Sequence, residues 1–178
     1  MWCRKNFREA HLSLSGQTDY SYNKEYVAQN ERADYLRYHA LHASLSTQWS
    51  GLSWFQPKLT LAGNLSWKKP DAFSATDNLL KNAYYSLTMD FYPISKLRLY
   101  ADFSQSVFEI AHSHYSVNSF LNAGLRYDFH PRWTVSADLS NLLNRKDYEV
   151  SLYQGANFQY YRVPLRGREF LVSLRFKY

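Results

Sequence analysis

The chain has 178 residues, and this length permits one ordinary domain. Its formal net charge is +6 and its mean hydropathy is −0.51. No more than three apolar residues follow one another, whereas a membrane-spanning helix needs about 20. Lys and Arg are scattered and form no stripe, so we expect no nucleic-acid partner. A single cysteine, Cys3, excludes an internal disulfide framework. Aromatic residues make up 18% of this polar chain, which is typical of strands with one apolar and one polar face.

The N-terminal residues Met1 to Lys5 carry basic side chains but no apolar core and no small-residue cleavage site. They therefore do not resemble a secretory signal. If the protein is exported, we expect this chain to be either mature or incomplete.

Apolar and polar residues alternate with period two along most of the chain, as in half-buried strands. The clearest case covers 115–129, where Ser119 and Phe120 are the only misfits. The C-terminus repeats the pattern with Leu171 as its exception. The sequence predicts eight strands, near 7–20, 37–49, 57–67, 82–92, 97–110, 115–129, 133–142 and 168–178.

The predicted connections alternate between long and short, which indicates an up-and-down meander. Residues 21–36, 68–81 and 143–167 form the long connections, and 111–114 lies on the same side. Outer-membrane barrels have short periplasmic turns and longer external loops, so the C-terminal Tyr178 is expected at the periplasmic rim.

Aromatic residues gather at predicted strand ends, as they do at both membrane interfaces of such barrels. One expected girdle flanks the short turns and the C-terminus: Trp49, Trp54, Phe55, Phe91, Tyr92, Phe129, Trp133, Phe176 and Tyr178. The other flanks the long loops: Trp67, Tyr84, Tyr85, Phe108, Tyr115 and Tyr148.

The predicted fold class is all-β, an antiparallel up-and-down transmembrane barrel, with residues 1–178 forming a single segment. Small polar side chains would fill a closed eight-stranded barrel poorly, so a larger wall is expected. The residues expected to face lipid are Leu97, Leu99, Leu121, Leu125, Leu139, Val172 and Leu174. Those expected to face the lumen are Asp90, Arg98, Arg126, Asp128 and Asp138, with Asp90 and Arg98 meeting across the turn at 93–96.

Two stretches near the C-terminus carry a family resemblance: 138–148, DLSNLLNRKDY, and 164–170, PLRGREF, followed by an alternating strand. Together they resemble the C-terminal end of TonB-dependent outer-membrane receptors. Their residues are most similar to those of the Bacteroidetes-type barrels. An aromatic terminus is kept, although Tyr178 stands where Phe is usual. The resemblance in motifs covers 138–178. Upstream of residue 138 only the general character of the sequence is similar.

The resemblance implies a bacterial outer-membrane location and nutrient uptake through a barrel of roughly 22 strands that holds a plug domain. Outer-membrane lipid and the barrel assembly machinery would be partners, and the TonB system would act only through a plug domain, which this chain lacks. The implied assembly signal is the terminal strand: Phe170, Val172, Leu174, Phe176 and Tyr178. Alternatives are an autonomous small barrel with a structural or adhesive role, a rim-active outer-membrane hydrolase and, less favoured, a soluble lipid-binding barrel.

Candidate chemistry is sparse, so we predict no catalytic residues, no metal site and no cofactor. His112 and His114 would share a face if extended, whereas His39 and His42 would not, and no further ligands stand in register. No G-x-S-x-G elbow or paired carboxylates stand out. The Tyr-rich segment 148–161, with Gln154, Asn157 and Gln159, could bind sugar or peptide or could simply extend a strand. The substrate is not predicted.

Overall fold

The structure is a computed structural model of the chain, and it describes every residue except 30–31, 70–77, 112–113 and 155–156. Every regular element in the described part is a β-strand, and no helix there is long and apolar enough to cross a membrane. The strands are β1 (Trp2–Phe7), β2 (Leu12–Gln29), β3 (Arg32–Trp49), β4 (Phe55–Lys68), β5 (Asn78–Ile94), β6 (Leu97–Ala111), β7 (His114–His130), β8 (Trp133–Ser140), β9 (Asp147–Gln154), β10 (Asn157–Pro164) and β11 (Glu169–Phe176).

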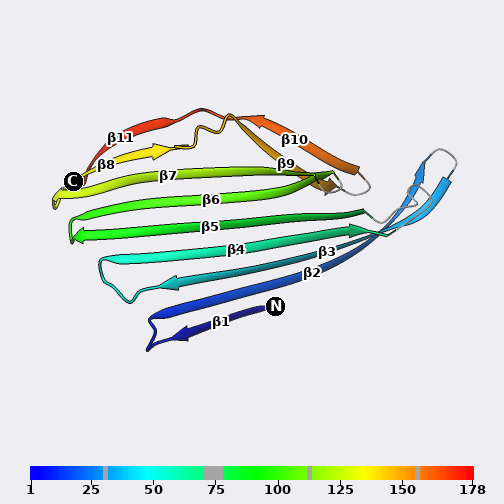
Figure 1. Ribbon diagram of the computed structural model, residues 1–178, viewed down its shortest axis with the longest axis horizontal. Coiled ribbons are helices and arrows are strands. Elements are labelled where there is room, and N and C mark those ends of the chain that lie inside the picture. Colours follow the sequence, from blue (N-terminus) through cyan, green and yellow to red (C-terminus); the bar gives the residue numbers. More distant parts are fainter. Residues whose placement is uncertain (30–31, 70–77, 112–113, 155–156) are drawn as a thin grey trace.

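Nine of these strands form one antiparallel sheet in the order β1-β2-β3-β4-β5-β6-β7-β8-β11, and β9 pairs with β10 in a separate hairpin (Figure 1). The antiparallel up-and-down arrangement is therefore confirmed. The sheet is open, because β1 and β11 each have a neighbour on one side only. The four connections at 8–11, 50–54, 95–96 and 131–132 lie at one end of the sheet, which we call the turn end (Figure 1).

Two stretches of the predicted strand map are wrong. The expected strand 7–20 is interrupted at 8–11, and β2 and β3 continue far into the expected loop 21–36 as a paired hairpin. This hairpin has polar residues on both sides, so its backbone pairing left no amphipathic signal in the sequence. The expected loop 143–167 contains β9 and β10, whose backbone groups satisfy each other in eight paired positions.

Strand register separates the side chains into two faces. In an antiparallel pair, directly opposite residues project from the same side of the sheet. One row runs Leu99, Leu125, Ala137, Val172, and the neighbouring row runs Leu97, Tyr127, Val135, Leu174. Leu121 lies opposite Phe103, and Leu139 lies opposite Ala123 and Phe170, on that same side. All seven residues predicted to face lipid thus share this side, which we call the apolar face.

The five residues predicted to face the lumen share the opposite side, which we call the polar face. Asp90 lies opposite Tyr100, which is followed across the sheet by Gly124 and Asp138. Arg98 lies opposite Arg126, and Asp128 bonds Arg126 and the Thr134 hydroxyl.

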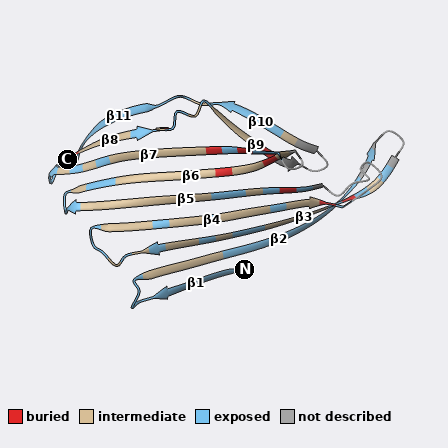
Figure 2. Ribbon diagram, in the orientation of Figure 1, coloured by how far each residue is buried: buried red, intermediate tan, exposed pale blue. Residues whose placement is uncertain are grey.

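The sheet has almost no conventional core. Leu36 and Leu80 are the only buried apolar residues in the described part of the chain, and most of the sheet is half-buried or exposed (Figure 2). Large side chains of the apolar face stay exposed, including Leu61 at 43% and Leu125 at 37%. A large apolar face that is left exposed or half-buried in this way is typical of contact with a non-aqueous environment or a partner.

Aromatic rings form a band on the apolar face at the turn end. Phe55 stacks on Phe91 with 4.8 Å between ring centroids and also contacts Trp49 and Trp54. Trp133 and Phe176 make a second pair at the same end, with centroids 4.7 Å apart.

A second aromatic cluster lies on the apolar face toward the opposite end, but its membership differs from the expectation. It consists of Trp67 with Tyr20, Tyr22 and His39, and the His39 ring lies parallel to Trp67 at 5.1 Å. The expected members Tyr84, Phe108 and Tyr148 belong to the polar face instead: Tyr84 and Phe108 lie there by register, and Tyr148 contacts Phe108 from the hairpin.

Candidate functional site

The β9–β10 hairpin lies over the polar face of β6 and β7, at the end away from the turns (Figure 1). Asn118 on β7 is completely buried, and its side chain bonds both backbone groups of Glu149 on β9. Its Nδ2 donates to the Glu149 carbonyl at 2.6 Å, and its Oδ1 accepts from the Glu149 N–H at 3.1 Å. The Asn118 amide therefore satisfies the two backbone groups of Glu149, as a neighbouring strand would do. These two hydrogen bonds hold β9 against the sheet.

An aromatic cluster supports the same contact. Tyr148 on β9 packs against Phe108 on β6 and Phe120 on β7, with ring centroids 6.1 and 6.2 Å away. Phe120 is one of the two misfits in the alternating pattern of β7, and the hairpin explains it. A ring on the polar face is stable here because another ring covers it.

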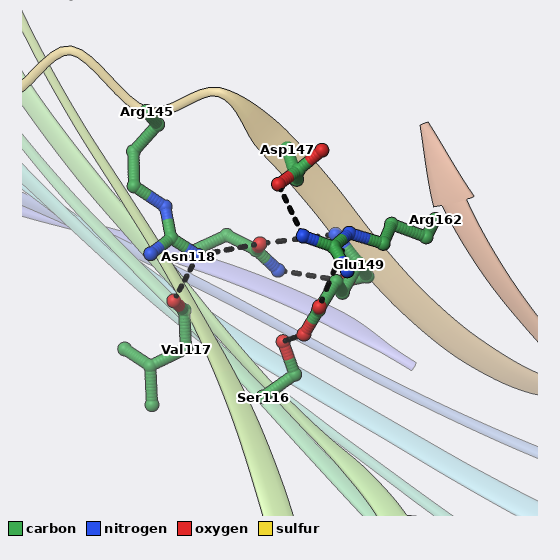
Figure 3. Close-up of polar contacts among 7 residues, drawn as sticks. All are labelled: Ser116, Val117, Asn118, Arg145, Asp147, Glu149 and Arg162. Carbon is green, nitrogen blue, oxygen red and sulfur yellow. Dashed lines mark hydrogen bonds and ion pairs between the residues drawn. The ribbon is translucent and has the colours of Figure 1, made fainter. Parts of the chain in front are cut away.

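Charged groups connect the two strands of the hairpin and the sheet below (Figure 3). Arg162 on β10 donates to Asp147 at 2.5 Å and lies 3.8 Å from the carboxylate of Glu149. Ser116 on β7 donates to the other Glu149 oxygen at 2.6 Å. The hydrogen bond from Ser116, then that from Tyr160, lowers the pKa of Glu149 below its ordinary value.

The same pairing affects the other members of the network. The hydrogen bond from Arg162 lowers the pKa of Asp147, and the bond to Asp147 raises the pKa of Arg162. Arg162 is exposed and Asp147 is only half-buried, so their pairing contributes little free energy on its own. An open polar pocket of about 450 Å³ lies against these residues; it is lined by Tyr115, Ser116, Val117, Asn144, Arg145, Lys146, Asp147, Glu149 and Arg162.

The two stretches that carry the family resemblance meet at Asn141. Its Nδ2 donates to the carbonyls of Arg145 and Arg166 at 2.7 and 2.8 Å, and its Oδ1 accepts from the Arg145 N–H at 2.8 Å. Asn141 has a φ of 52°, a left-handed conformation that Asn tolerates better than most residues. One buried amide thus joins the start of the hairpin to the segment that leads into β11.

A smaller groove of about 230 Å³ lies beside the hairpin on the polar face. Its lining comes from four adjacent strands and β9: His42, Ala62, Gly63, Asn64, Asn82, Ala83, Tyr84, Ser106, Phe108 and Tyr148. No Asp, Glu, Lys or Arg lines it.

At the turn end the polar face carries ion pairs instead. The expected Asp90–Arg98 contact is present: Arg98 donates through Nε to Asp90 at 2.8 Å from the diagonal position. Arg126 pairs with Asp128 at 3.4 Å. Asp138 joins neither pair and accepts a hydrogen bond from Tyr100 at 2.5 Å.

The remaining predicted sites are placed as follows. His39 lies on the apolar face and His42 on the polar face, as expected from their spacing. His112 lies outside the described residues, so the expectation for the His112–His114 pair stays a prediction. The implied assembly strand corresponds to β11, which is exposed along its whole length, and Tyr178 follows it.

Sequence reasoning missed Asn118 and Glu149, because an amide or carboxylate on a strand gives no signal of its own. Asn141 lies within the stretch 138–148 that carries the resemblance, but its contacts with Arg145 and Arg166 were not predicted. The misplaced ring of Phe120 was the one available indication that something covers this face. Chemically, the hairpin region offers hydrogen bonds, ion pairs and ring faces, which suit binding of a ligand. Comparisons with known protein families, with curated proteins and with solved structures gave no match.

Proposed function

We propose that this chain forms part of the wall of a bacterial outer-membrane β-barrel, as the C-terminal segment of a TonB-dependent receptor for nutrient uptake. The observation that carries the proposal is the uncovered apolar face, with aromatic clusters near both ends of its strands. An all-β sheet without a core gains little from burying its own side chains, so its apolar face needs lipid or another apolar surface.

The separation of the aromatic clusters supports a membrane as that surface. Along β4, Trp67 follows Phe55 by twelve residues. At about 3.3 Å per residue and a strand tilt of about 40°, this corresponds to roughly 30 Å along the membrane normal. The hydrocarbon core of a bilayer has about that thickness.

The two free edges favour a segment of a larger wall over an autonomous small barrel. Both β1 and β11 leave backbone groups unpaired, which is costly in lipid, so the proposal requires further strands at these edges. The resemblance at 138–178 supports the receptor class, and the polar face would then line the channel with the hairpin inside it. A structural or adhesive small barrel is the second candidate, and it requires β1 and β11 to pair with each other.

Site-directed spin labelling in reconstituted membranes tests the membrane-wall proposal. Labels at Leu99, Leu125 and Val172 should relax with oxygen and stay insensitive to an aqueous nickel reagent, while labels at Ser104 and Ser136 on the polar face should not share that pattern. Leu125→Arg should reduce insertion stability by about 2–4 kcal/mol if position 125 lies near the midplane. Nickel accessibility across the apolar face would contradict the proposal.

To distinguish the two barrel classes, a cysteine crosslink between β1 and β11 should form only in a small closed barrel.

A further inference from the structure

The groove beside the hairpin combines ring faces with amides in a part of the polar face that carries no Asp, Glu, Lys or Arg. Its side chains come from two adjacent rows on the polar face. One row contains His42, Asn64, Asn82 and Phe108, and the other contains Ala62, Tyr84 and Ser106. The small side chain of Ala62 leaves the space that the larger neighbours surround.

The absence of charge at this place narrows the ligand class. Ion pairs lie on the same face toward the turn end, and the Arg162 network lies on the hairpin. None of these charged side chains lines the groove. A carboxylate, phosphate or ammonium ligand would lose its hydration without a counter-charge, which is unfavourable. The groove therefore fits a neutral ligand.

Several polar groups of the groove remain available to such a ligand. Among the described residues, the side chains of His42 and Asn64 and the hydroxyl of Tyr84 make no hydrogen bond. Asn82 uses its carbonyl oxygen to accept from the Glu109 N–H at 3.3 Å, which leaves its two N–H donors. Side-chain amides offer a donor and an acceptor side by side, which matches two adjacent hydroxyl groups.

Aromatic residues supply the apolar part of the groove. Tyr84 is 42% exposed, and Phe108 and Tyr148 close the side nearest the hairpin. A sugar ring has a C–H face that packs on an aromatic ring and a rim of hydroxyls that needs hydrogen bonds. A neutral peptide would instead favour a free strand edge, and the groove lies in the middle of the sheet.

We propose that this groove binds a neutral sugar unit of a glycan. The amides of Asn64 and Asn82 hold its hydroxyls, and Tyr84 contacts its C–H face. Tyr148 comes from the hairpin, so the site is complete only when the hairpin lies on the sheet. The inference deepens the proposed function, because the polar face is the one that would line the channel.

Binding can be measured on the intact protein in detergent by calorimetry and intrinsic fluorescence. The probes are maltohexaose, cellohexaose, xylohexaose and mannohexaose, with tetra-alanine that is acetylated and amidated at its ends as the neutral peptide. We expect saturable binding of at least one glycan, at least about tenfold weaker in Tyr84→Ala and in Asn64→Ala, since one lost contact of about 1.4 kcal/mol gives that factor. Asn118→Ala should also weaken binding, because it releases the hairpin that carries Tyr148.

Tyr85→Ala is the matched control. Tyr85 is the next residue of β5, but it projects from the apolar face and bonds Gln105 there, so its loss should leave glycan affinity within about twofold. No saturable glycan binding, tighter binding of tetra-alanine, or equal losses in the Tyr84 and Tyr85 variants would overturn the proposal. Spin labelling reports on the membrane wall separately, so glycan binding by a chain whose apolar face faces water would refute the proposed function and not the groove.

Discussion

Tyr100 on β6 reaches across Gly124 on β7 to donate a hydrogen bond to Asp138 on β8. A Cβ atom at position 124 would lie 2.5 Å from the Tyr100 ring, so the glycine is required for this close approach. Gly63, the other glycine within the central strands, has only the Asn82 carbonyl oxygen near its missing Cβ, at 3.9 Å. Nothing in the strand pattern distinguishes Gly124 from Gly63, because a ring on another strand imposes the constraint at Gly124.

Gly124→Ala should therefore destabilise the sheet by about 1–3 kcal/mol, whereas Gly63→Ala should change little. The measurement is urea-dependent unfolding in detergent micelles. In the Tyr100→Ser background, where no ring remains to collide, the added Gly124→Ala change should cost less than about 0.5 kcal/mol. Equal destabilisation in both backgrounds would show that the ring contact does not explain the glycine.

The other misfit in β7, Ser119, also has a partner that lies on another strand. It accepts a hydrogen bond from Gln105, and Gln105 accepts one from Tyr85, so three polar side chains form a chain across the apolar face. Alternation of apolar and polar residues predicts which face a residue occupies. It does not predict which residues on that face contact one another, because contacts depend on register between strands.

At the level of elements, the hairpin was the main feature that the sequence did not predict. Its strands do alternate, with Tyr148 and Val150 against Asp147, Glu149 and Ser151. Their docking depends on contacts far apart in the sequence: Asn118 holds Glu149, and Ser151 donates to the Glu109 carbonyl at 2.6 Å. Long connections carry function more often than strands do, and here the connection between β8 and β11 covers the polar face.

Docking of the hairpin should depend on pH in the acid range only. The pKa values of Asp147 and Glu149 are lowered from ordinary values of 3.8 and 4.5. A carboxyl group with a lowered pKa in the folded state contributes stability that is complete above its unfolded value and is lost as the pH falls through its folded value. Protection of 147–164 from hydrogen exchange, corrected for the intrinsic rate, should stay constant from pH 8 to about 5.5 and decrease below about 4.

Glu149→Gln serves as the matched variant, because it keeps the shape of the side chain and removes its charge. At pH 7 its hairpin should exchange faster than the natural one, and the acid-dependent loss of protection should be smaller. A loss of protection that begins near pH 6, or an unchanged acid response in Glu149→Gln, would contradict the assignment to these carboxyls.

At the level of the whole molecule, period-two alternation predicted the antiparallel order and both faces, because each strand repeats the same pattern. The alternation could not predict whether the edge strands β1 and β11 pair with further strands, because it describes the faces of a strand and not its edges. The paired stretches at 138–148 and 164–170 proved to be in contact through Asn141, so their joint occurrence has a structural reason.

Deletion of Tyr178 is expected to reduce membrane assembly more than it destabilises a barrel already formed. β11 offers one unpaired edge, and an assembly factor could add a strand there while alternate side chains provide specificity. Tyr178 lies beyond the end of β11 and is fully exposed, so its loss removes little packing within the sheet.

Trp133→Ala is the matched comparison, because it removes a turn-end ring that packs on Phe176 and leaves the terminus intact. Heat-modifiable barrel in outer-membrane fractions measures assembly, and urea unfolding of the purified barrel measures stability. The deletion should mainly lower the first quantity and Trp133→Ala mainly the second. Equal loss of assembly in both variants, or none in the deletion, would leave Tyr178 as an interfacial aromatic with no part in assembly.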